Sequence, residues 1–150
     1  MTGKGSLNHN SRKFHAKNTD PNRTHWNVEY CNEDIKDVYH ELFDDALKRY
    51  NDKQTRKDRK IDDYYEKIRS GKQEKLFHEV ILQIGDKDNM GSETMEGQLA
   101  AKILDEYMKG FQERNPTLRV FAAHLHLDEA TPHLHIDFIP VSYTHLTLPT

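Results

Sequence analysis

The spacing of hydrophobic residues changes along the chain and divides it into segments. Residues 1–32 are polar and lack a sustained period, and turn-forming pairs such as Asp20-Pro21 predict loops. In residues 35–50 the apolar side chains recur at the spacing of one helix face, which predicts a helix capped by Asn32 or Asp34. The apolar set of this helix is Ile35, Val38, Tyr39, Leu42, Phe43, Ala46, Leu47 and Tyr50.

The rest of the chain alternates between helical and extended patterns. Residues 57–69 predict a charged surface helix, and residues 77–84 predict a strand that stops at Gly85-Asp86. Residues 93–114 predict a long helix that Asn115-Pro116 terminates. The face of that helix expected to be apolar holds Leu99, Ile103, Leu104, Tyr107, Met108 and Phe111.

Two more strands are predicted near the end of the sequence, over residues 118–127 and 132–140. The short connection between them predicts that they pair as an antiparallel hairpin. Helices come first, and a strand, a helix and two strands follow. This order predicts an α+β fold, with an antiparallel sheet and helices on one face.

Charged residues are distributed unevenly along the chain, which the net charge does not show. The formal net charge is −3 and charged residues make up 31% of the 150 residues. Residues 48–75 nevertheless hold eleven Lys and Arg against six Asp and Glu, and residues 1–24 contain Asp20 as their single acidic residue. Local basic stretches of this kind can hold a phosphate backbone despite a negative total.

Cysteine usage and hydropathy bear on the compartment. Cys31 is the single cysteine, so no disulfide can form within the chain, which fits a reducing cytosol. No apolar run approaches the roughly 20 residues that a membrane helix needs, and residues 1–6 lack the apolar core of a signal peptide. We therefore expect a cytoplasmic protein without a membrane segment.

Four of the ten histidines fall within residues 124–135, in the phase of a strand. Alternate residues of a strand face the same side, so His124 and His126 share one face and His133 and His135 share a face of the next strand. Such a group favours neutral imidazoles around a divalent cation, and three protein ligands without cysteine are typical of a catalytic metal site. The alternative is a polar strand face that carries histidines by chance.

A second polar cluster lies near the N-terminus. It includes His9-Asn10-Ser11-Arg12, Asn18 and Arg23, whose amide and guanidinium groups can hold phosphates. By itself this cluster is compatible with a mobile polar end of the chain.

Both clusters together resemble a known family. The string His126-x-Asp128-Glu129-x-x-Pro132-His133-x-His135 is similar to the signature of plasmid mobilization and recombination relaxases of the Pre/Mob group (MobV-type), which belong to the His-hydrophobe-His (HUH) endonucleases. The segments around His9 and Asp20-Pro21 resemble the other motif of this family. The resemblance covers residues 3–140. It implies a metal-dependent enzyme that nicks one strand of plasmid DNA at a transfer origin, stays joined to the 5′ phosphate and later rejoins the strand.

The resemblance also implies roles for single residues. His126, His133 and His135 would hold the metal, which by analogy is Mn²⁺ or Mg²⁺, although three imidazoles alone prefer zinc, nickel or copper. Glu129 would be a catalytic residue that holds or polarises the metal site. His9 would be the nucleophile with Arg12 beside it. The DNA contacts would come from Arg12, Asn18 and Arg23.

Most related relaxases use a tyrosine nucleophile, so Tyr30, Tyr64 and Tyr65 are rivals to His9. Asp128 is a further candidate for orienting an imidazole. His124 lies outside the family string and is expected to be an ordinary exposed histidine.

The last ten residues differ in composition from the rest of the chain. Residues 141–150 carry no charge and resemble the translation of a transposase adapter used in sequencing libraries. We expect residues 1–140 to be the N-terminal part of a relaxase domain and residues 141–150 to be an artefact. The fold would then be incomplete, and a C-terminal region that forms dimers in the family would be missing.

Three other functions stay open on the sequence. One is a metal-dependent hydrolase unrelated to DNA, because His124-x-His126-x-Asp128 is similar to half of a metallo-β-lactamase motif, which has His where Glu129 stands here. The second is a rolling-circle replication initiator. The third is a DNA-binding fragment that keeps the metal and cannot cut.

Overall fold

The computed structural model describes residues 2–3, 6–86, 88 and 90–141. Within them, five strands form one sheet in the order β1-β3-β5-β4-β2, and every neighbouring pair is antiparallel. The strands are β1 (Thr2–Gly3), β2 (Val28–Asn32), β3 (His78–Gln83), β4 (Leu118–His126) and β5 (His133–Pro140). Most of the tail predicted to be adapter-derived, residues 142–150, lies outside the described residues.

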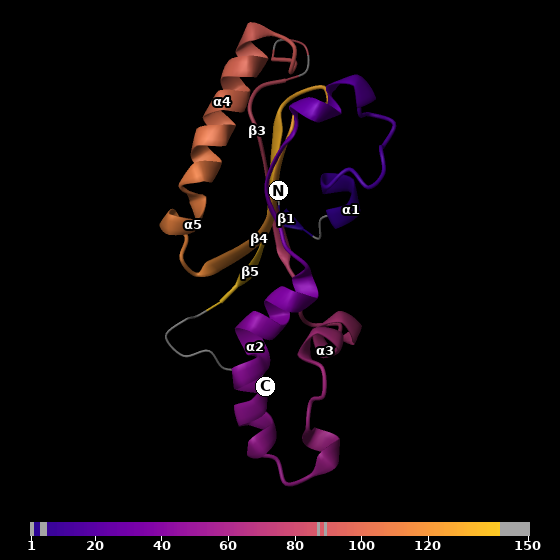
Figure 1. Cartoon of the computed structure of the whole chain (residues 1–150), viewed down its shortest axis with the longest axis vertical. Helices are drawn as coiled ribbons and strands as arrows, with labels where there is room; N and C mark the ends of the chain where they lie inside the picture. The colour runs from indigo at the N-terminus through magenta and orange to yellow at the C-terminus, as the bar shows by residue number, and fades with distance from the viewer. Residues whose placement is uncertain (1, 4–5, 87, 89, 142–150) are drawn as a thin grey trace.

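The helices surround this sheet on both sides (Figure 1). They are α1 (Leu7–Asn10), α2 (Ile35–Asp52), α3 (Tyr64–Ser70), α4 (Met95–Lys109) and α5 (Phe111–Arg114), with 3-10 turns η1 (Pro21–Trp26) and η2 (Lys57–Arg59). None of the helices in the described part of the chain is both long and apolar enough to cross a membrane.

The most regular helix of the sequence forms as predicted. Asp34 caps α2, because its side chain accepts hydrogen bonds from the backbone N–H groups of Lys36 and Asp37. The prediction of one helix over residues 57–69 is wrong. Asp63 caps α3 through the N–H of Glu66, so the helix begins at Tyr64 and a separate 3-10 turn precedes it.

Helices were expected on one face of the sheet, and this expectation is wrong. Figure 1 shows α4 and α5 on one side of the sheet and α1 on the other, with α2 and α3 at one end. Phe121 and Ile139 pack against α2 and α3, whereas Ala123 and Ile136 pack with the apolar residues of α4 and α5. Strands that are apolar on both faces must be covered on both.

The long helix predicted over residues 93–114 is divided at Gly110 into α4 and α5. Its apolar face is also narrower than expected. Leu104, Met108 and Phe111 are buried against the sheet, whereas Leu99 and Ile103 are exposed, as is Tyr107.

The predicted hairpin is confirmed, since β4 and β5 pair with His124 opposite His135 and His126 opposite His133. The prediction of loops throughout residues 1–32 missed β2, which pairs with the outer edge of β4. β3 pairs with β5 on the other side of the hairpin. The histidine pairs therefore lie inside the sheet.

The two faces of α4 give a matched test of the core. Leu104→Ala is expected to lower the free energy of unfolding by about 2–5 kcal/mol, because it removes buried methyl groups and leaves a cavity. Leu99→Ala on the exposed face of the same helix should change it by less than about 0.5 kcal/mol. Denaturant titration of both variants measures the difference, and equal losses would contradict this packing.

Candidate metal centre

The central strands gather the histidines on the sheet face that carries α1. His126 is fully buried, His124 and His135 are nearly so, and the side chain of His133 is 19% exposed. Hydrophobic residues that alternate with them, such as Leu125 and Leu134, belong to the opposite core. Strand phase therefore separates the polar site from the core.

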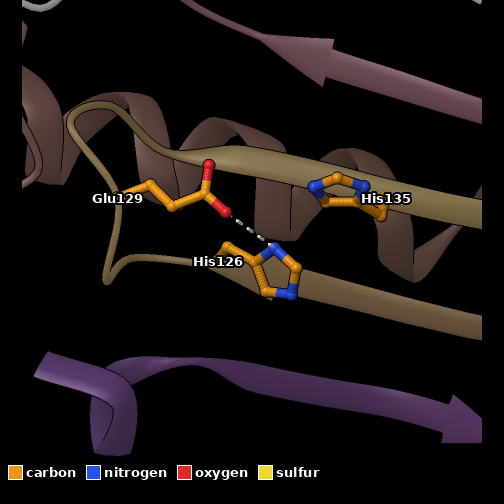
Figure 2. A group of neighbouring side chains, drawn as sticks. All are labelled: His126, Glu129 and His135. Atoms are coloured by element: carbon orange, nitrogen blue, oxygen red, sulfur yellow. Dashed lines mark ion pairs between the residues drawn. The ribbon is translucent and has the colours of Figure 1, made fainter. Parts of the chain in front are cut away.

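Glu129 brings a carboxylate into the cluster from the turn between β4 and β5. Potential ligand atoms of His126, Glu129 and His135 all lie within 4.8 Å of one another. Figure 2 shows the Glu129 carboxylate pointing toward the ring of His126, with Oε1 3.6 Å from Nδ1, and His135 on the adjacent strand. The other oxygen, Oε2, lies 3.5 Å from Nδ1 of His133.

Each of the three predicted ligands has one ring nitrogen buried without a hydrogen-bond partner. These atoms are Nδ1 of His126, Nδ1 of His133 and Nε2 of His135. In two of these histidines the other ring nitrogen is hydrogen-bonded. Nε2 of His126 donates to the carbonyl oxygen of Asn10 at 2.8 Å, and Nδ1 of His135 donates to Oε1 of Glu79 at 2.5 Å. A ring fixed on one side with a free lone pair on the other is the arrangement of metal-ligating histidine. The residues present therefore fit a divalent cation.

Burial keeps the imidazoles of His126 and His133 neutral. Burial lowers the pKa of His126 to about 3. Burial also lowers the pKa of His133, although Glu129 opposes the shift. A neutral imidazole is the form that binds a metal.

His124 is not the exposed histidine that was expected. It is buried, and its Nε2 lies 3.0 Å from Oε1 of Glu29. The cause is β2, which carries Glu29 and covers the edge of β4.

Arg12 joins the N-terminal segment to the turn of the hairpin. Its Nε and Nη2 donate to the two oxygens of Asp128 at 2.8 and 2.5 Å, and Nη2 also donates to Oε1 of Glu129 at 2.9 Å. Burial would raise the pKa of Asp128, but hydrogen bonds from Arg12 and Thr24 lower it to about 2. The Arg12 side chain is 7% exposed. These engaged donors favour a positioning role for Arg12 over the phosphate contact expected from the sequence.

His9 lies at the open side of the cluster. The Ser6 hydroxyl caps α1 by accepting from the backbone N–H of His9. The His9 side chain is 21% exposed, with Nε2 3.5 Å from Oε1 of Glu129 and 3.2 Å from Nη1 of Arg12. Its ring centre is 6.0 Å from that of His126. The structure thus brings His9, Arg12 and Glu129 together beside the histidine cluster.

The other predicted residues lie farther out. Arg23 donates to the carbonyl oxygen of Leu127 and pairs with Asp20, and Asn18 is exposed on the preceding loop. The rival tyrosines pack elsewhere. Tyr30 donates to Asp105 of α4, and Tyr64 and Tyr65 pack around Tyr39 of α2.

The sequence reasoning named Asn10 only as part of the N-terminal cluster, and it missed two buried residues behind the histidines, Glu79 and Asp137. Burial and the neighbouring Glu79 raise the pKa of Asp137 to about 8. Burial would also raise the pKa of Glu79, but hydrogen bonds from His135 and Asp137 bring it below its ordinary value. Asp137 could have been found, because it follows His135 in strand phase. Glu79 could not, because its place depends on the pairing of β3 with β5.

Comparisons with known proteins agree with this geometry. A family model described as plasmid recombination enzyme (Mob_Pre) matches residues 4–148. Two solved structures of the MobM relaxase domain (MOBV; Mob_Pre), Mn-bound and in complex with 22 nucleotides of plasmid pMV158 oriT DNA, are similar to the chain. The structure at pH 5.5 has 27% identity and a TM-score of 0.53, and the structure at pH 4.6 has 26% identity and a TM-score of 0.51.

Each of these matches covers 94% of this chain and 65% of the other, so the chain spans less than two thirds of those relaxase domains. They confirm the predicted α+β relaxase fold. None of the curated protein sequences that were compared matches the chain.

Calorimetric titration with Mn²⁺ tests the ligands. His126→Ala and His135→Ala are each expected to weaken binding by more than about 100-fold, beyond the loss caused by residues that only support ligands. His124→Ala is the matched control, since His124 lies opposite His135 on the same face and its Nε2 faces Glu29. An equal loss in His124→Ala would contradict this choice of ligands.

The same titration decides between His133 and Glu129 as the third ligand. If His133 is the ligand, His133→Ala should show the full loss, whereas Glu129→Gln should stay within about 10- to 100-fold of the unmodified chain. The reverse order would place Glu129 on the metal.

Proposed function

The chain belongs to the plasmid recombination enzyme family, and we propose that it nicks and rejoins one strand of plasmid DNA at a transfer origin. The carrying observation is the position of His9, 3.5 Å from Glu129 and beside histidines whose free nitrogens are buried. A nucleophile next to a cation site is the arrangement that phosphoryl transfer needs. Plasmid DNA in the cytoplasm is the proposed substrate. Dimer formation through a further C-terminal region stays a prediction.

We assign the metal to His126, His133 and His135, with Mn²⁺ or Mg²⁺ as the ion. A divalent cation on neutral ligands keeps its charge and can polarise the scissile phosphate. The Mn-bound relaxase domains similar to this chain support this assignment. Glu129 then lies between the ligands and His9, where it can act on both.

His9 is the nucleophile of the covalent step. A lone pair of its neutral ring attacks the phosphorus, and the new N–P bond forms as the bond from phosphorus to the 3′ oxygen breaks. The bonding electrons leave with the 3′ oxygen, which takes up a proton to become the 3′ hydroxyl. Glu129 is close enough to accept the proton that the imidazole loses. Rejoining reverses these steps, so the energy of the phosphate ester is conserved.

Arg12 and Asp128 position His9 for this attack. Nη1 of Arg12 donates to the carbonyl oxygen of His9 at 2.8 Å while its other nitrogens hold Asp128. The turn that carries His9 is therefore fixed to the turn that carries Glu129. Holding reacting groups in one geometry accounts for a large part of enzymatic rate enhancement.

The exposed segment beside His9 is suited to single-stranded DNA. Residues 13–15 and 17–18 are exposed and include Lys13, Lys17 and Asn18. Phe14 is 50% exposed, and its ring centre is 5.7 Å from that of His9. Positive charge interleaved with an exposed aromatic ring is typical of single-strand binding, where bases stack on the ring.

The first rival function is that of a chain that binds DNA and metal without cutting. A replication initiator shares the chemistry and differs in the DNA it selects. A hydrolase unrelated to DNA would not need the segment around Phe14.

A nicking assay on supercoiled plasmid with the cognate origin and Mn²⁺ tests the nucleophile. His9→Ala is expected to lower the nicking rate by at least about 10³-fold and to abolish the covalent protein–DNA product. His25→Ala is the matched control, since His25 is an exposed histidine of the same N-terminal segment. Covalent product that survives in His9→Ala but disappears in Tyr64→Phe or Tyr30→Phe would transfer the role to that tyrosine.

Binding of a single-stranded origin oligonucleotide tests the DNA surface. Phe14→Ala is expected to weaken binding by about 1–3 kcal/mol, because one base loses its stacking partner. Leu99→Ala is the control, as Leu99 is an exposed apolar residue on α4. Fluorescence anisotropy measures both affinities. Equal affinity of Phe14→Ala and the unmodified chain would exclude stacking at this position.

A further inference from the structure

Asn10 is the last residue of α1 and follows His9 directly in the chain. Only 2% of its surface is exposed. Asparagine is seldom buried in this way unless its polar atoms have partners. Its partners connect the turn that carries His9 with three strands of the sheet.

The contacts of Asn10 reach β4, β3 and β5. Its main-chain carbonyl accepts from Nε2 of His126 at 2.8 Å. Its side-chain Nδ2 donates to Oε2 of Glu79 at 3.3 Å and to Oδ2 of Asp137 at 3.4 Å. Glu79 in turn accepts from Nδ1 of His135 at 2.5 Å. One hydrogen bond therefore connects Asn10 to His126, and a chain of two hydrogen bonds through Glu79 connects Asn10 to His135.

These hydrogen bonds select the free nitrogen of each ring. Carbonyl and carboxylate oxygens only accept, so His126 carries its proton on Nε2 and His135 carries its proton on Nδ1. Nδ1 of His126 and Nε2 of His135 are left as lone pairs. They are also the atoms that lie buried without a partner.

We propose that Asn10 is a positioning residue, which ties the turn carrying His9 to the metal-binding nitrogens so that nucleophile and ligands keep one geometry. This inference rests on the proposed function. The side-chain amide is the group that fits, because its two N–H bonds meet two carboxyl oxygens. Alanine would leave both oxygens without this donor, and aspartate would add a third carboxyl group to the contact.

Titration with Mn²⁺ in the absence of DNA tests the link to the ligands. Asn10→Ala is expected to weaken Mn²⁺ binding by about 10- to 100-fold, the loss typical of residues that orient ligands. Asn8→Ala is the matched control, because Asn8 lies on the same turn with an exposed side chain, and its affinity should equal that of the unmodified chain. Unchanged affinity in Asn10→Ala would overturn the proposal, even if its melting temperature fell.

Single-turnover nicking at saturating Mn²⁺ tests the link to His9. The rate constant of Asn10→Ala is expected to fall by about 100-fold while DNA affinity stays within about two-fold, because a misplaced nucleophile slows the chemical step rather than binding. A rate that saturating Mn²⁺ restores in full would overturn the link. If the unmodified chain does not nick, the proposed function fails, and the Mn²⁺ titration still decides the role of Asn10.

A paired exchange covers the case in which Asn10→Ala does not fold. Asn10→Asp alone is expected to lose Mn²⁺ affinity, since it brings three carboxyl groups together. Adding Asp137→Asn returns an amide to the contact and should recover at least about ten-fold of the lost affinity, as expected for two directly coupled residues. No recovery in the double variant would overturn the proposal.

Discussion

The buried ion pair between Arg12 and Asp128 is the contact on which the site depends. It joins residues 116 positions apart, and Thr24 also donates to Asp128, while the N–H of Asp20 donates to the Asp128 carbonyl oxygen. Arg12 has a φ of 57°, a left-handed backbone that costs a non-glycine residue free energy. The two bonds to Asp128 and the one to Glu129 offset that cost. Together with the hydrogen bond from His126 to the carbonyl oxygen of Asn10, they hold the turn that carries His9 against the hairpin.

With this ion pair in place, one face of the sheet carries both an apolar core and the polar site. At one end of the face, α2 and α3 cover Phe121 and Ile139 with an ordinary apolar core. At the other end the covering element is the single turn α1, which is too short to bury much surface and is held by polar contacts instead. Buried polar groups are costly unless each has a partner. The nitrogens that lack one include Nδ1 of His126, Nδ1 of His133 and Nε2 of His135, for which a metal would be the partner.

The sequence predicted the parts of this arrangement that depend on local pattern. Strand phase and the short turn correctly predicted that the two pairs of histidines lie on two strands paired as a hairpin, and the helix spacing with Asp34 located α2. Features that depend on distant pairing could not be predicted. β2 has no alternating pattern, so its cover over His124 was missed, and Glu79 joins the site because β3 lies beside β5. On α4 the spacing could not say which half of a broad apolar face would meet the sheet.

The two neighbouring carboxylates of the turn divide the work between structure and chemistry. Asp128 is fully buried, accepts from Arg12 and Thr24, and has a pKa lowered to about 2, so its charge is fixed over the physiological range. Glu129 shares one bond with Arg12 and keeps its oxygens near His9, His126 and His133. Neighbouring carboxyl groups in different environments commonly take different roles in a site. A carboxylate that already holds the fold together cannot also move to follow a reaction. Because Asp128 carries the ion pair with Arg12, Glu129 is the carboxylate left to respond to the proposed nucleophile and metal.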